Sequence, residues 1–380
     1  MTVSKRPASH RARHLAAFGL ILLAQFGVFE AALRTWGHSE AAPAFQGLFI
    51  YPETGYRLNP NARVRFTTSE FDTEIRINGS GVRDDEEIGP KPPNERRIVL
   101  LGDSLVLAVQ VPFSQTFGEL LERRLNADRS PYRYRVINAG VQGYGPVEEL
   151  HFFESIAATL QPDLVIETLF VGNDAEEASR TGSRLKTGGA APPLDVKDTV
   201  ATQFRRLVRR SMVLQLLRLR VVSATARFHG LLAAPEPPLQ SYAASPAPRI
   251  AEGLAITRQC VRDIAAVAAS QGASTAIALM PARFQVDDAD YGRLKEAVTA
   301  AGGELQRDAA SQRFDAALAE LPLPRVDLLP ALRRALPGPD LFFQETVHLT
   351  PRGHEIVAEA LYRFIEERHL GTPEPARPSR

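Results

Sequence analysis

Short apolar runs alternate along the chain with amphipathic segments. The apolar runs are rich in β-branched residues and have the length of buried parallel strands; they cover residues 97–101, 134–137, 164–170 and 275–279. The amphipathic segments repeat apolar residues with helical spacing; they cover residues 115–125, 146–160, 252–270 and 351–367. Because strands and helices alternate, we predict an α/β fold, a three-layer α/β/α sandwich with a mainly parallel sheet.

The N-terminal segment has the pattern of a membrane-targeting sequence. Residues 1–14 carry four cations and no acid, and residues 15–29 are apolar apart from Gln25. Continued to Trp36, the apolar segment approaches the ~20 residues that cross a bilayer, and the basic flank fits the positive-inside rule. We therefore predict an uncleaved signal anchor over residues 1–36, a single transmembrane helix with the rest of the chain on the extracytoplasmic side. A cleaved signal peptide and a buried amphipathic helix are the alternatives.

The rest of the chain is predicted to form one main domain with additions. Residues 63–77 alternate enough between polar and apolar positions for a strand or hairpin, and residues 78–81 close it with turn formers. The expected parts are a small β-rich extension over residues 37–95, a main domain over 96–370 with a helical insertion at 175–250, and a disordered proline-rich tail over 371–380.

The predicted insertion contains an arginine-rich segment. Residues 199–234 include seven arginines and no acid, and in a helix the first four arginines lie opposite to apolar residues. We expect an inserted helix with a solvated arginine face. A helix on an anionic membrane surface, or a lid over the active site, is the alternative.

Composition and charge narrow the function classes. Of the 380 residues 44% are hydrophobic, enough for a large core, and 45 Lys and Arg against 44 Asp and Glu leave a net charge of +1. Such a balance gives no overall field that attracts nucleic acid, so we expect no nucleic-acid partner. A single cysteine, Cys260, can form neither an intramolecular disulfide nor a cysteine-based metal site.

Polar residues of a reactive kind follow three of the predicted strands. Ser104 comes directly after the run 97–101 in a Gly-Asp-Ser-Leu turn, Gly143 lies in a glycine-rich loop after the second strand, and Asn173 follows the third. Ligands of open α/β sheets bind at the carboxyl ends of the strands, so we expect these residues to lie together. His348, with Glu345 three residues before it, precedes the last predicted helix.

These residue types suit acyl transfer. The reaction needs a nucleophilic hydroxyl, a base that takes its proton, an acid that orients the base, and donors for the oxyanion. The sequence contains no G-x-S-x-G nucleophile elbow, phosphate-binding loop, H-E-x-x-H zinc motif or dinucleotide-binding glycine motif. The pattern therefore indicates a serine esterase with no metal and no other cofactor.

Four motifs resemble the conserved blocks of the SGNH/GDSL hydrolase superfamily. They are G-D-S-L at 102–105, N-x-G-x-x-G at 138–143, G-N-D at 172–174 and H-L-T-P-x-G-H at 348–354. The resemblance covers roughly residues 96–365 and implies a flavodoxin-like sheet. It implies Ser104 as nucleophile and first oxyanion amide, Gly143 as second amide, Asn173 as side-chain donor and His348 as base.

The acid of the triad departs from the family pattern. The family usually has aspartate three residues before the histidine, whereas this sequence has Glu345. A longer carboxylate can fill the role, so we expect Glu345 to complete the triad. Asp340 and Asp327 are the reserve candidates, and a backbone carbonyl could also hold the imidazole. His354, beside the start of the last helix, is expected to be structural.

The predicted function is that of a serine esterase that hydrolyses or transfers an acyl ester through an acyl-enzyme on Ser104. The membrane-anchored layout with a β extension resembles bacterial envelope members of the superfamily. This resemblance implies the bacterial inner membrane as location, a periplasmic catalytic domain and O-acetyl groups of an envelope carbohydrate as one substrate. A lipase or thioesterase, and a non-catalytic binding or scaffolding protein, are the alternatives. We expect an acyl-ester partner, attachment to the membrane through the N-terminal helix, and a monomer.

Overall fold

The structure is a computed structural model that describes residues 8–36, 47–50, 56–127, 130–186, 213, 239–336, 340–346 and 348–371. The chain divides into two compact units. One unit comprises residues 1–46 and 196–234, and the other comprises 47–195 and 235–380. The functional residues predicted from the sequence all belong to the second unit, which we call the catalytic unit.

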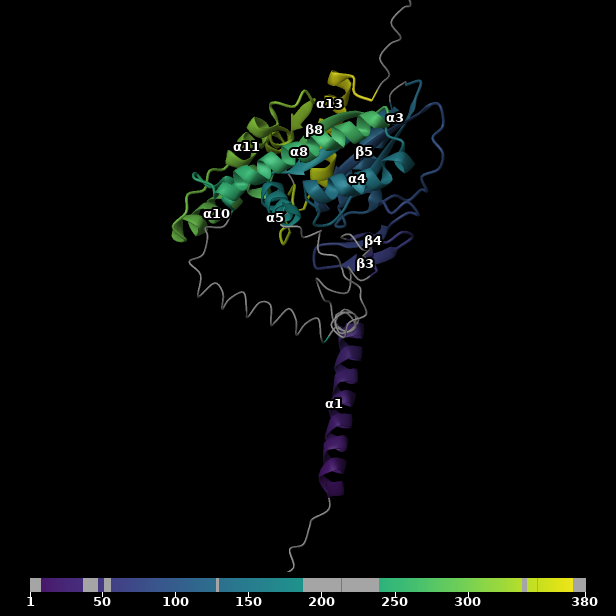
Figure 1. Cartoon of the computed structure of the whole chain (residues 1–380), viewed down its shortest axis with the longest axis vertical. Helices are drawn as coiled ribbons and strands as arrows, with labels where there is room; N and C mark the ends of the chain where they lie inside the picture. Colours follow the sequence, from purple (N-terminus) through teal and green to yellow (C-terminus); the bar gives the residue numbers. More distant parts are fainter. Residues whose placement is uncertain are drawn as a thin grey trace, which may run out of the picture. The chain divides into compact units, whose positions relative to one another are not determined.

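A five-stranded parallel sheet forms the centre of the catalytic unit (Figure 1). Its order is β6-β5-β7-β8-β9, and all four neighbouring pairs are parallel. The strands are β5 (Glu95–Gly102), β6 (Arg133–Gly140), β7 (Leu164–Phe170), β8 (Ser274–Met280) and β9 (Arg325–Asp327). Side chains of the inner strands are buried on both faces, as the continuous apolar runs predicted. The predicted α/β class with a mainly parallel sheet is therefore confirmed.

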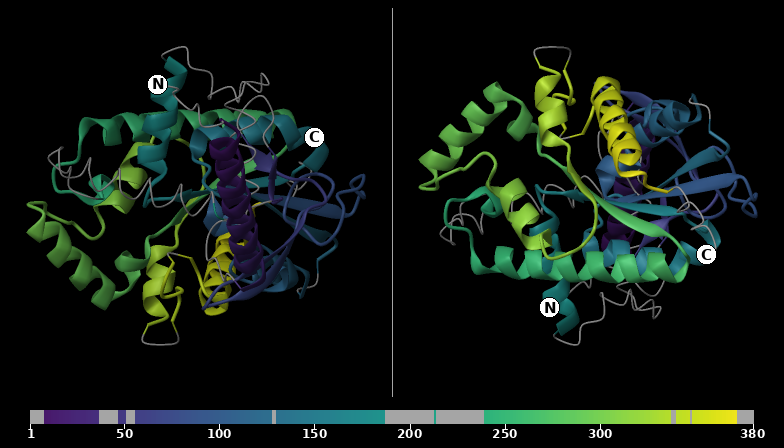
Figure 2. Two further views of the ribbon diagram at one scale, coloured as in Figure 1. Left: turned by 90° about the horizontal axis from the view of Figure 1, so that it is seen from below. Right: turned by 90° about the horizontal axis from the view of Figure 1, so that it is seen from above.

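Helices cover both faces of this sheet, and α8 and α13 lie on opposite sides of it (Figure 2). The α-helices are α2 (Ser104–Leu107), α3 (Phe117–Ala127), α4 (Pro146–Leu160), α5 (Asp174–Lys186), α8 (Pro248–Ser270), α9 (Arg283–Val286), α10 (Asp288–Ala300), α11 (Ala309–Leu318), α12 (Leu329–Arg334) and α13 (Pro351–Arg368). Two short 3₁₀ turns cover Phe113–Gln115 and Gln240–Tyr242. Thr350 caps α13 by accepting a hydrogen bond from the backbone of Gly353.

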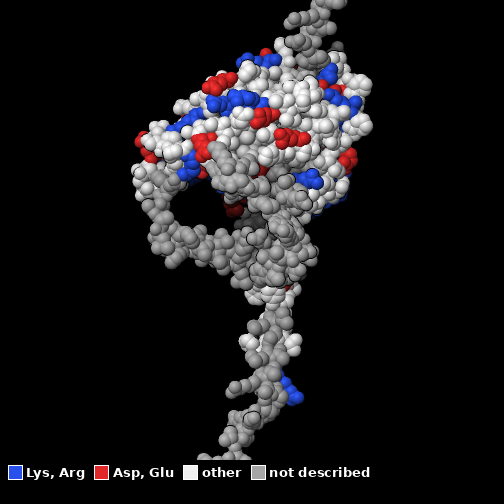
Figure 3. Space-filling model, in the orientation of Figure 1, with Lys and Arg blue, Asp and Glu red and all other residues white. Residues whose placement is uncertain are grey.

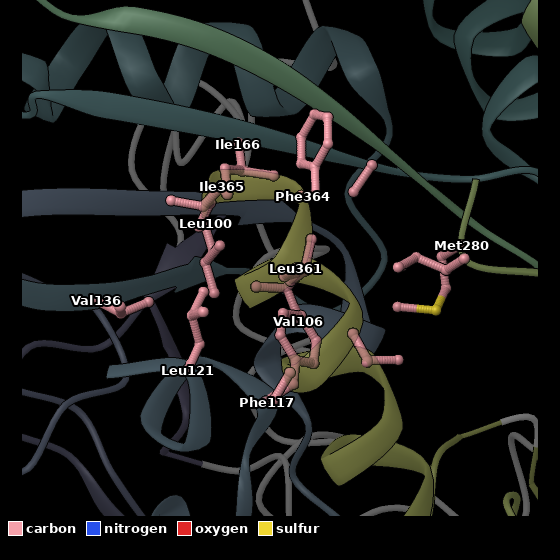
Figure 4. Close-up of a cluster of buried hydrophobic side chains, with 14 of the residues drawn as sticks. Leu100, Val106, Phe117, Leu121, Val136, Ile166, Met280, Leu361, Phe364 and Ile365 are labelled. Carbon is pink, nitrogen blue, oxygen red and sulfur yellow. The ribbon is translucent and has the colours of Figure 1, made fainter. Parts of the chain in front are cut away.

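Two apolar cores fasten the layers to the sheet. On one face α3 and α13 pack against β5, β6 and β7 (Figure 4); the buried residues there include Leu100, Phe117, Leu121, Val136, Ile166, Leu361, Phe364 and Ile365. On the other face α8 and α11 pack against β7 and β8; these residues include Leu169, Ile250, Val261, Ile277, Leu279 and Phe314. Burial of each large apolar side chain contributes about 1.5–3 kcal/mol, so these layers hold the strand ends in place.

The predicted β extension contains two antiparallel pairs of strands. The first pair is β1 (Phe49–Ile50) with β2 (Arg57–Leu58), and the second is the hairpin of β3 (Arg63–Thr67) and β4 (Asp72–Arg76). In the hairpin turn, Thr68 Oγ1 accepts hydrogen bonds from the backbone N–H groups of Glu70 and Phe71, at 3.1 and 3.2 Å. This bonding fixes the turn between the strands.

The predicted N-terminal helix forms as α1 (Ala8–Trp36). Among the residues that the structure describes, no helix is both long and apolar enough to cross a membrane. The predicted signal anchor over residues 1–36 stays a prediction.

Much of the predicted insertion lies outside the described residues. Its first part forms α5, and its last part belongs to the start of α8. The arginine-rich segment 199–234 lies outside the described residues except for residue 213, and so does the tail from residue 372. Their predicted roles stay predictions.

Candidate active site

Ser104 lies in a sharp turn from strand to helix. Strand β5 ends at Gly102, Asp103 caps the next helix by accepting a hydrogen bond from the N–H of Leu105 at 2.8 Å, and Ser104 is the first residue of α2. The side chain of Ser104 is held at the carboxyl edge of the sheet, and the residue is 9% exposed. This is the position that the motif G-D-S-L predicted.

The neighbouring strand β6 fixes the short helix that begins with Ser104. Asn138 Nδ2 donates a hydrogen bond to the carbonyl of Val106 at 2.6 Å. A Cβ atom on Gly140 would clash with the backbone nitrogen of Leu107 and would lie 2.8 Å from the carbonyl carbon of Val106. Two residues of the N-x-G-x-x-G motif thus hold the nucleophile turn by close backbone packing.

A buried arginine from the β extension holds the other end of this turn. Arg83 is 1% exposed and donates hydrogen bonds to the carbonyls of Leu107 and Ala108 and, at 2.7 Å, of Val111. Ala108 has the left-handed backbone conformation, with φ of 54°, that ends α2. Burial lowers the pKa of Arg83 to about 9. The sequence pattern does not identify Arg83 as part of the site, because nothing around it distinguishes it from a solvated arginine.

His348 faces Ser104. Its Nε2 atom lies 2.9 Å from Ser104 Oγ, which is hydrogen-bond distance, although 244 positions separate the two residues in the chain. Burial of the imidazole lowers the pKa of His348 to about 4. The ring is therefore neutral at pH 7, and a neutral Nε2 can accept the serine proton. The structure brings together the predicted nucleophile and the predicted base.

The predicted acid is not joined to this histidine. The buried Nδ1 of His348 has no hydrogen-bond partner among the described residues. Glu345 is exposed, and its Oε2 accepts a hydrogen bond from Ser69 Oγ at 3.1 Å. Of the reserve candidates, Asp340 accepts a hydrogen bond from the side chain of Gln344 and Asp327 accepts one from the N–H of Leu329. The structure therefore shows a Ser–His pair, and the triad acid stays a prediction.

The predicted oxyanion donors follow the two strands on either side of β5. Gly102 pairs with Gly140 of β6 on one side and with Thr168 of β7 on the other. Gly143 comes three residues after β6 and has a φ of 74°, a left-handed conformation that favours glycine. Asn173 comes three residues after β7, and its side chain hydrogen-bonds with Glu177. The topology places both residues at the edge that holds Ser104, and their oxyanion role stays a prediction.

An aromatic pair supports the loop of Gly143. Tyr56 donates a hydrogen bond from its hydroxyl to the carbonyl of Gln142 at 2.7 Å, and the hydroxyl of Tyr144 donates to the carbonyl of Tyr56. The two rings are 5.2 Å apart in an edge-to-face arrangement. The β extension therefore contacts the loop of Gly143 as well as the turn of Ser104.

Four buried carboxyl groups interact electrostatically with one another, which the sequence pattern does not predict. They belong to Asp103, Glu149, Glu167 and Asp174. Burial raises the pKa of each above the usual carboxyl range, and repulsion between neighbours raises it further for Glu149 and Asp174. In the described part of the chain, no group of three or more His, Cys, Asp or Glu side chains is arranged to hold a metal ion.

His354 has the structural role that the sequence predicted. Its Nδ1 accepts a hydrogen bond from the backbone N–H of Phe117, the first residue of α3, at 3.1 Å. Its ring stacks on the ring of Phe117 with centroids 5.6 Å apart. Burial lowers the pKa of His354 to about 3, so this histidine stays neutral.

Charges on the surface of the catalytic unit are mixed. Figure 3 shows Lys and Arg interspersed with Asp and Glu over the visible face. This mixture agrees with a net charge of +1 for the whole chain. The visible face carries no extended area of a single sign.

Comparison with known proteins gives one family match. Residues 241–378 match the family model described as the SGNH hydrolase-like domain of the acetyltransferase AlgX. Among curated proteins, none has a sequence that matches this chain.

Similar solved structures are esterases and related proteins of low sequence identity. The structure of TesA has 15% identity, covers 72% of this chain and 99% of its own, and gives a TM-score of 0.39. The esterase EstA from Pseudoalteromonas sp. has 12% identity, with 72% and 98% covered and a TM-score of 0.39. The lipase/acylhydrolase from Enterococcus faecalis has 19% identity, with 72% and 96% covered and a TM-score of 0.36.

The family match includes part of the site. The matched segment contains His348, and the residue that this histidine contacts is the serine of the G-D-S-L motif. Residues 241–378 are therefore similar to the SGNH hydrolase-like domain family.

Proposed function

We propose that this protein is a serine esterase or acyltransferase that cleaves an acyl ester through an acyl-enzyme on Ser104. The observation that carries the proposal is the 2.9 Å contact between Ser104 Oγ and Nε2 of a neutral His348. A protein that only binds a ligand has no need of a hydroxyl placed against a buried neutral base.

The proposed reaction has two halves. In the first, His348 Nε2 takes the proton of Ser104 while Oγ attacks the ester carbonyl carbon. The N–H groups of Ser104 and Gly143 and the amide of Asn173 hold the oxyanion, each donor contributing about 10²–10³ in rate. The tetrahedral intermediate collapses, the carbon–oxygen bond to the alcohol breaks, and His348 returns the proton to the leaving alcohol. In the second half, water or an acceptor hydroxyl removes the acyl group by the same steps.

We propose O-acetyl groups of an envelope carbohydrate as the substrate class. Support comes from the family that residues 241–378 match, which is named for an acetyltransferase. A polysaccharide hydroxyl in place of water in the second half-reaction would make the same acyl-enzyme a transferase.

The first test uses the full chain and a fluorophosphonate probe, which labels activated serines. We expect labelling in the wild type and in Ser114→Ala, because Ser114 is an exposed serine in the turn at 113–115. Labelling should disappear in Ser104→Ala. Folded wild-type protein that takes up no label would contradict the proposal.

A second test determines the substrate class. Release of the acyl group is compared for p-nitrophenyl acetate, a long-chain p-nitrophenyl ester and an acetylated oligosaccharide, each with and without an unacetylated acceptor glycan. We expect Ser104-dependent preference for the acetyl compounds, and acceptor-stimulated release would indicate transfer. Preference for the long-chain ester would overturn the assignment of a carbohydrate substrate, and the proposal of an esterase would still hold.

A further inference from the structure

The loop that carries His348 is held by residues from outside the hydrolase motifs. In a complete triad the acid orients the imidazole. In the described part of this chain, Nδ1 of His348 has no partner, so another contact must fix the position of the ring. The segment 340–346 ends two positions before His348, with position 347 between them, and its backbone is bonded from two directions.

The first set of contacts comes from the turn of the β3–β4 hairpin. The carboxylate of Glu70 accepts two hydrogen bonds from successive backbone N–H groups, with Gln344 bonded to Oε1 at 2.6 Å and Glu345 bonded to Oε2 at 3.1 Å. The rings of Phe71 and Phe343 lie beside these bonds with centroids 5.5 Å apart. Hydrogen bonds to a charged carboxylate are about twice as strong as neutral ones, so Glu70 is the strongest contact of the turn.

The second set of contacts comes from α9. Arg283 Nη1 donates to the carbonyls of Phe343 and Gln344, both at 2.8 Å, and its guanidinium pairs with Asp290 at 3.2 Å. Phe343 also contacts the residue that carries the base, because its N–H donates to the carbonyl of His348 at 3.0 Å. Glu70 thus accepts hydrogen bonds from N–H groups of the segment, and Arg283 donates hydrogen bonds to its carbonyls. The segment is held from both sides.

We propose that Glu70 is a positioning residue for catalysis: by binding the N–H groups of Gln344 and Glu345, it holds the loop that aims His348 at Ser104. This inference rests on the proposed function, and it gives the β extension a role in the reaction. The step that Glu70 supports is proton transfer from Ser104 to Nε2, which depends on a distance near 2.9 Å.

The contacts of Glu70 suit positioning better than general stabilisation. Glu70 is half-buried at the tip of the hairpin, whereas the hairpin itself is held by its strand pairing and by the buried side chains of Phe66 and Ile75. Loss of the Glu70 carboxylate should therefore leave the hairpin folded and release only the loop.

The test compares Glu70→Ala with Glu74→Ala. Glu74 lies on β4 of the same hairpin with an exposed side chain, so it is a matched control. Two experiments are made on the full chain: one measures hydrogen exchange of the amides of Gln344 and Glu345, and the other measures kcat and KM for p-nitrophenyl acetate. For Glu70→Ala we expect exchange at least about tenfold faster and kcat lower by about 10–100-fold, with KM changed less than about threefold. Glu74→Ala should match the wild type in both.

The outcomes separate this inference from the proposed function. Unchanged exchange in Glu70→Ala overturns the inference, and so does faster exchange with unchanged kcat. A wild type without any esterase activity would overturn the proposed function, and exchange would then report on the loop alone. Glu70→Gln adds a graded check, since it keeps one acceptor oxygen and should fall between the wild type and Glu70→Ala in both measurements.

Discussion

Glu345 accepts a hydrogen bond from Ser69 Oγ at 3.1 Å, and this contact ties the acid expected for the triad to the β3–β4 hairpin. Both side chains are exposed, so the bond between them is weak compared with a buried carboxylate–imidazole pair. In the described residues the imidazole of His348 meets only Ser104. On the proposed mechanism, we expect the Ser–His pair to carry out the proton transfer and the loop to orient the imidazole.

Glu345→Gln should therefore retain most of the activity. Glutamine keeps an oxygen that can accept from Ser69, and His348 loses no partner, so we expect kcat/KM within about threefold of the wild type. Neutralising a working triad acid lowers kcat by about 10⁴. The measurement is hydrolysis of p-nitrophenyl acetate, with Asp340→Asn as the matched variant. A loss above about 10² for Glu345→Gln alone would mean that this side chain reaches His348 in the working enzyme.

The acid limb of the pH–activity profile should lie at a lower pH than an ordinary histidine base would give. Burial lowers the pKa of His348 to about 4. A general base acts in its deprotonated form, so kcat/KM should rise through pH ~4 and be nearly complete at pH 6. With an ordinary histidine pKa, only about a quarter of the molecules would be active at pH 6. An acid limb at or above pH 6.5 would indicate that a carboxylate stabilises the imidazolium. Return of each sample to pH 7 checks that the loss is reversible.

Gly140→Ala should damage the nucleophile turn. The new Cβ would press on the backbone of Val106 and Leu107, and neither atom is the end of a flexible side chain. We expect a stability loss of about 1–3 kcal/mol in urea unfolding and at least tenfold slower fluorophosphonate labelling of Ser104. Gly292→Ala in α10 is the control, because a Cβ there meets no atom within 4 Å; it should be neutral or slightly stabilising. Normal labelling with unchanged stability in Gly140→Ala would show that the turn can adjust.

The buried carboxyl of Glu167 should make stability depend on pH. Burial raises its pKa above the ordinary 4.5, so the folded protein keeps the neutral form while the unfolded chain ionises. The contribution of this group is therefore present below pH ~4.5 and is lost as pH rises through its folded pKa. Glu167→Gln is neutral at every pH, so its Tm relative to wild type should be higher at pH 8 than at pH 5. Exposed Glu154→Gln should show no such change. An equal Tm difference at both pH values would contradict the expectation.

The sequence predicted the parts of the fold whose signals are local. Apolar, β-branched runs identified β5, β6, β7 and β8, and the turn residues at their ends identified Ser104. Strand β9 was missed because it has only three residues, with Arg325 and Asp327 on either side of one valine. Such an edge strand depends on pairing with β8 rather than on its own pattern.

The missed features of the site come from contacts between distant parts of the chain. A spacing of three residues places Glu345 near His348 along the chain, but it does not fix where the carboxylate points. That direction depends on Ser69 and Glu70, which lie about 275 positions away.

The position of Arg83 limits how the protein can be shortened. Its guanidinium supplies the donors for three carbonyls next to the nucleophile, although the sheet begins only at Glu95. A fragment that starts at the first strand of the sheet would contain all four motifs and would lack the hydrogen bonds that Arg83 donates to these carbonyls. We therefore expect the smallest fragment that holds the turn of Ser104 in place to begin within the β extension, ahead of the first motif.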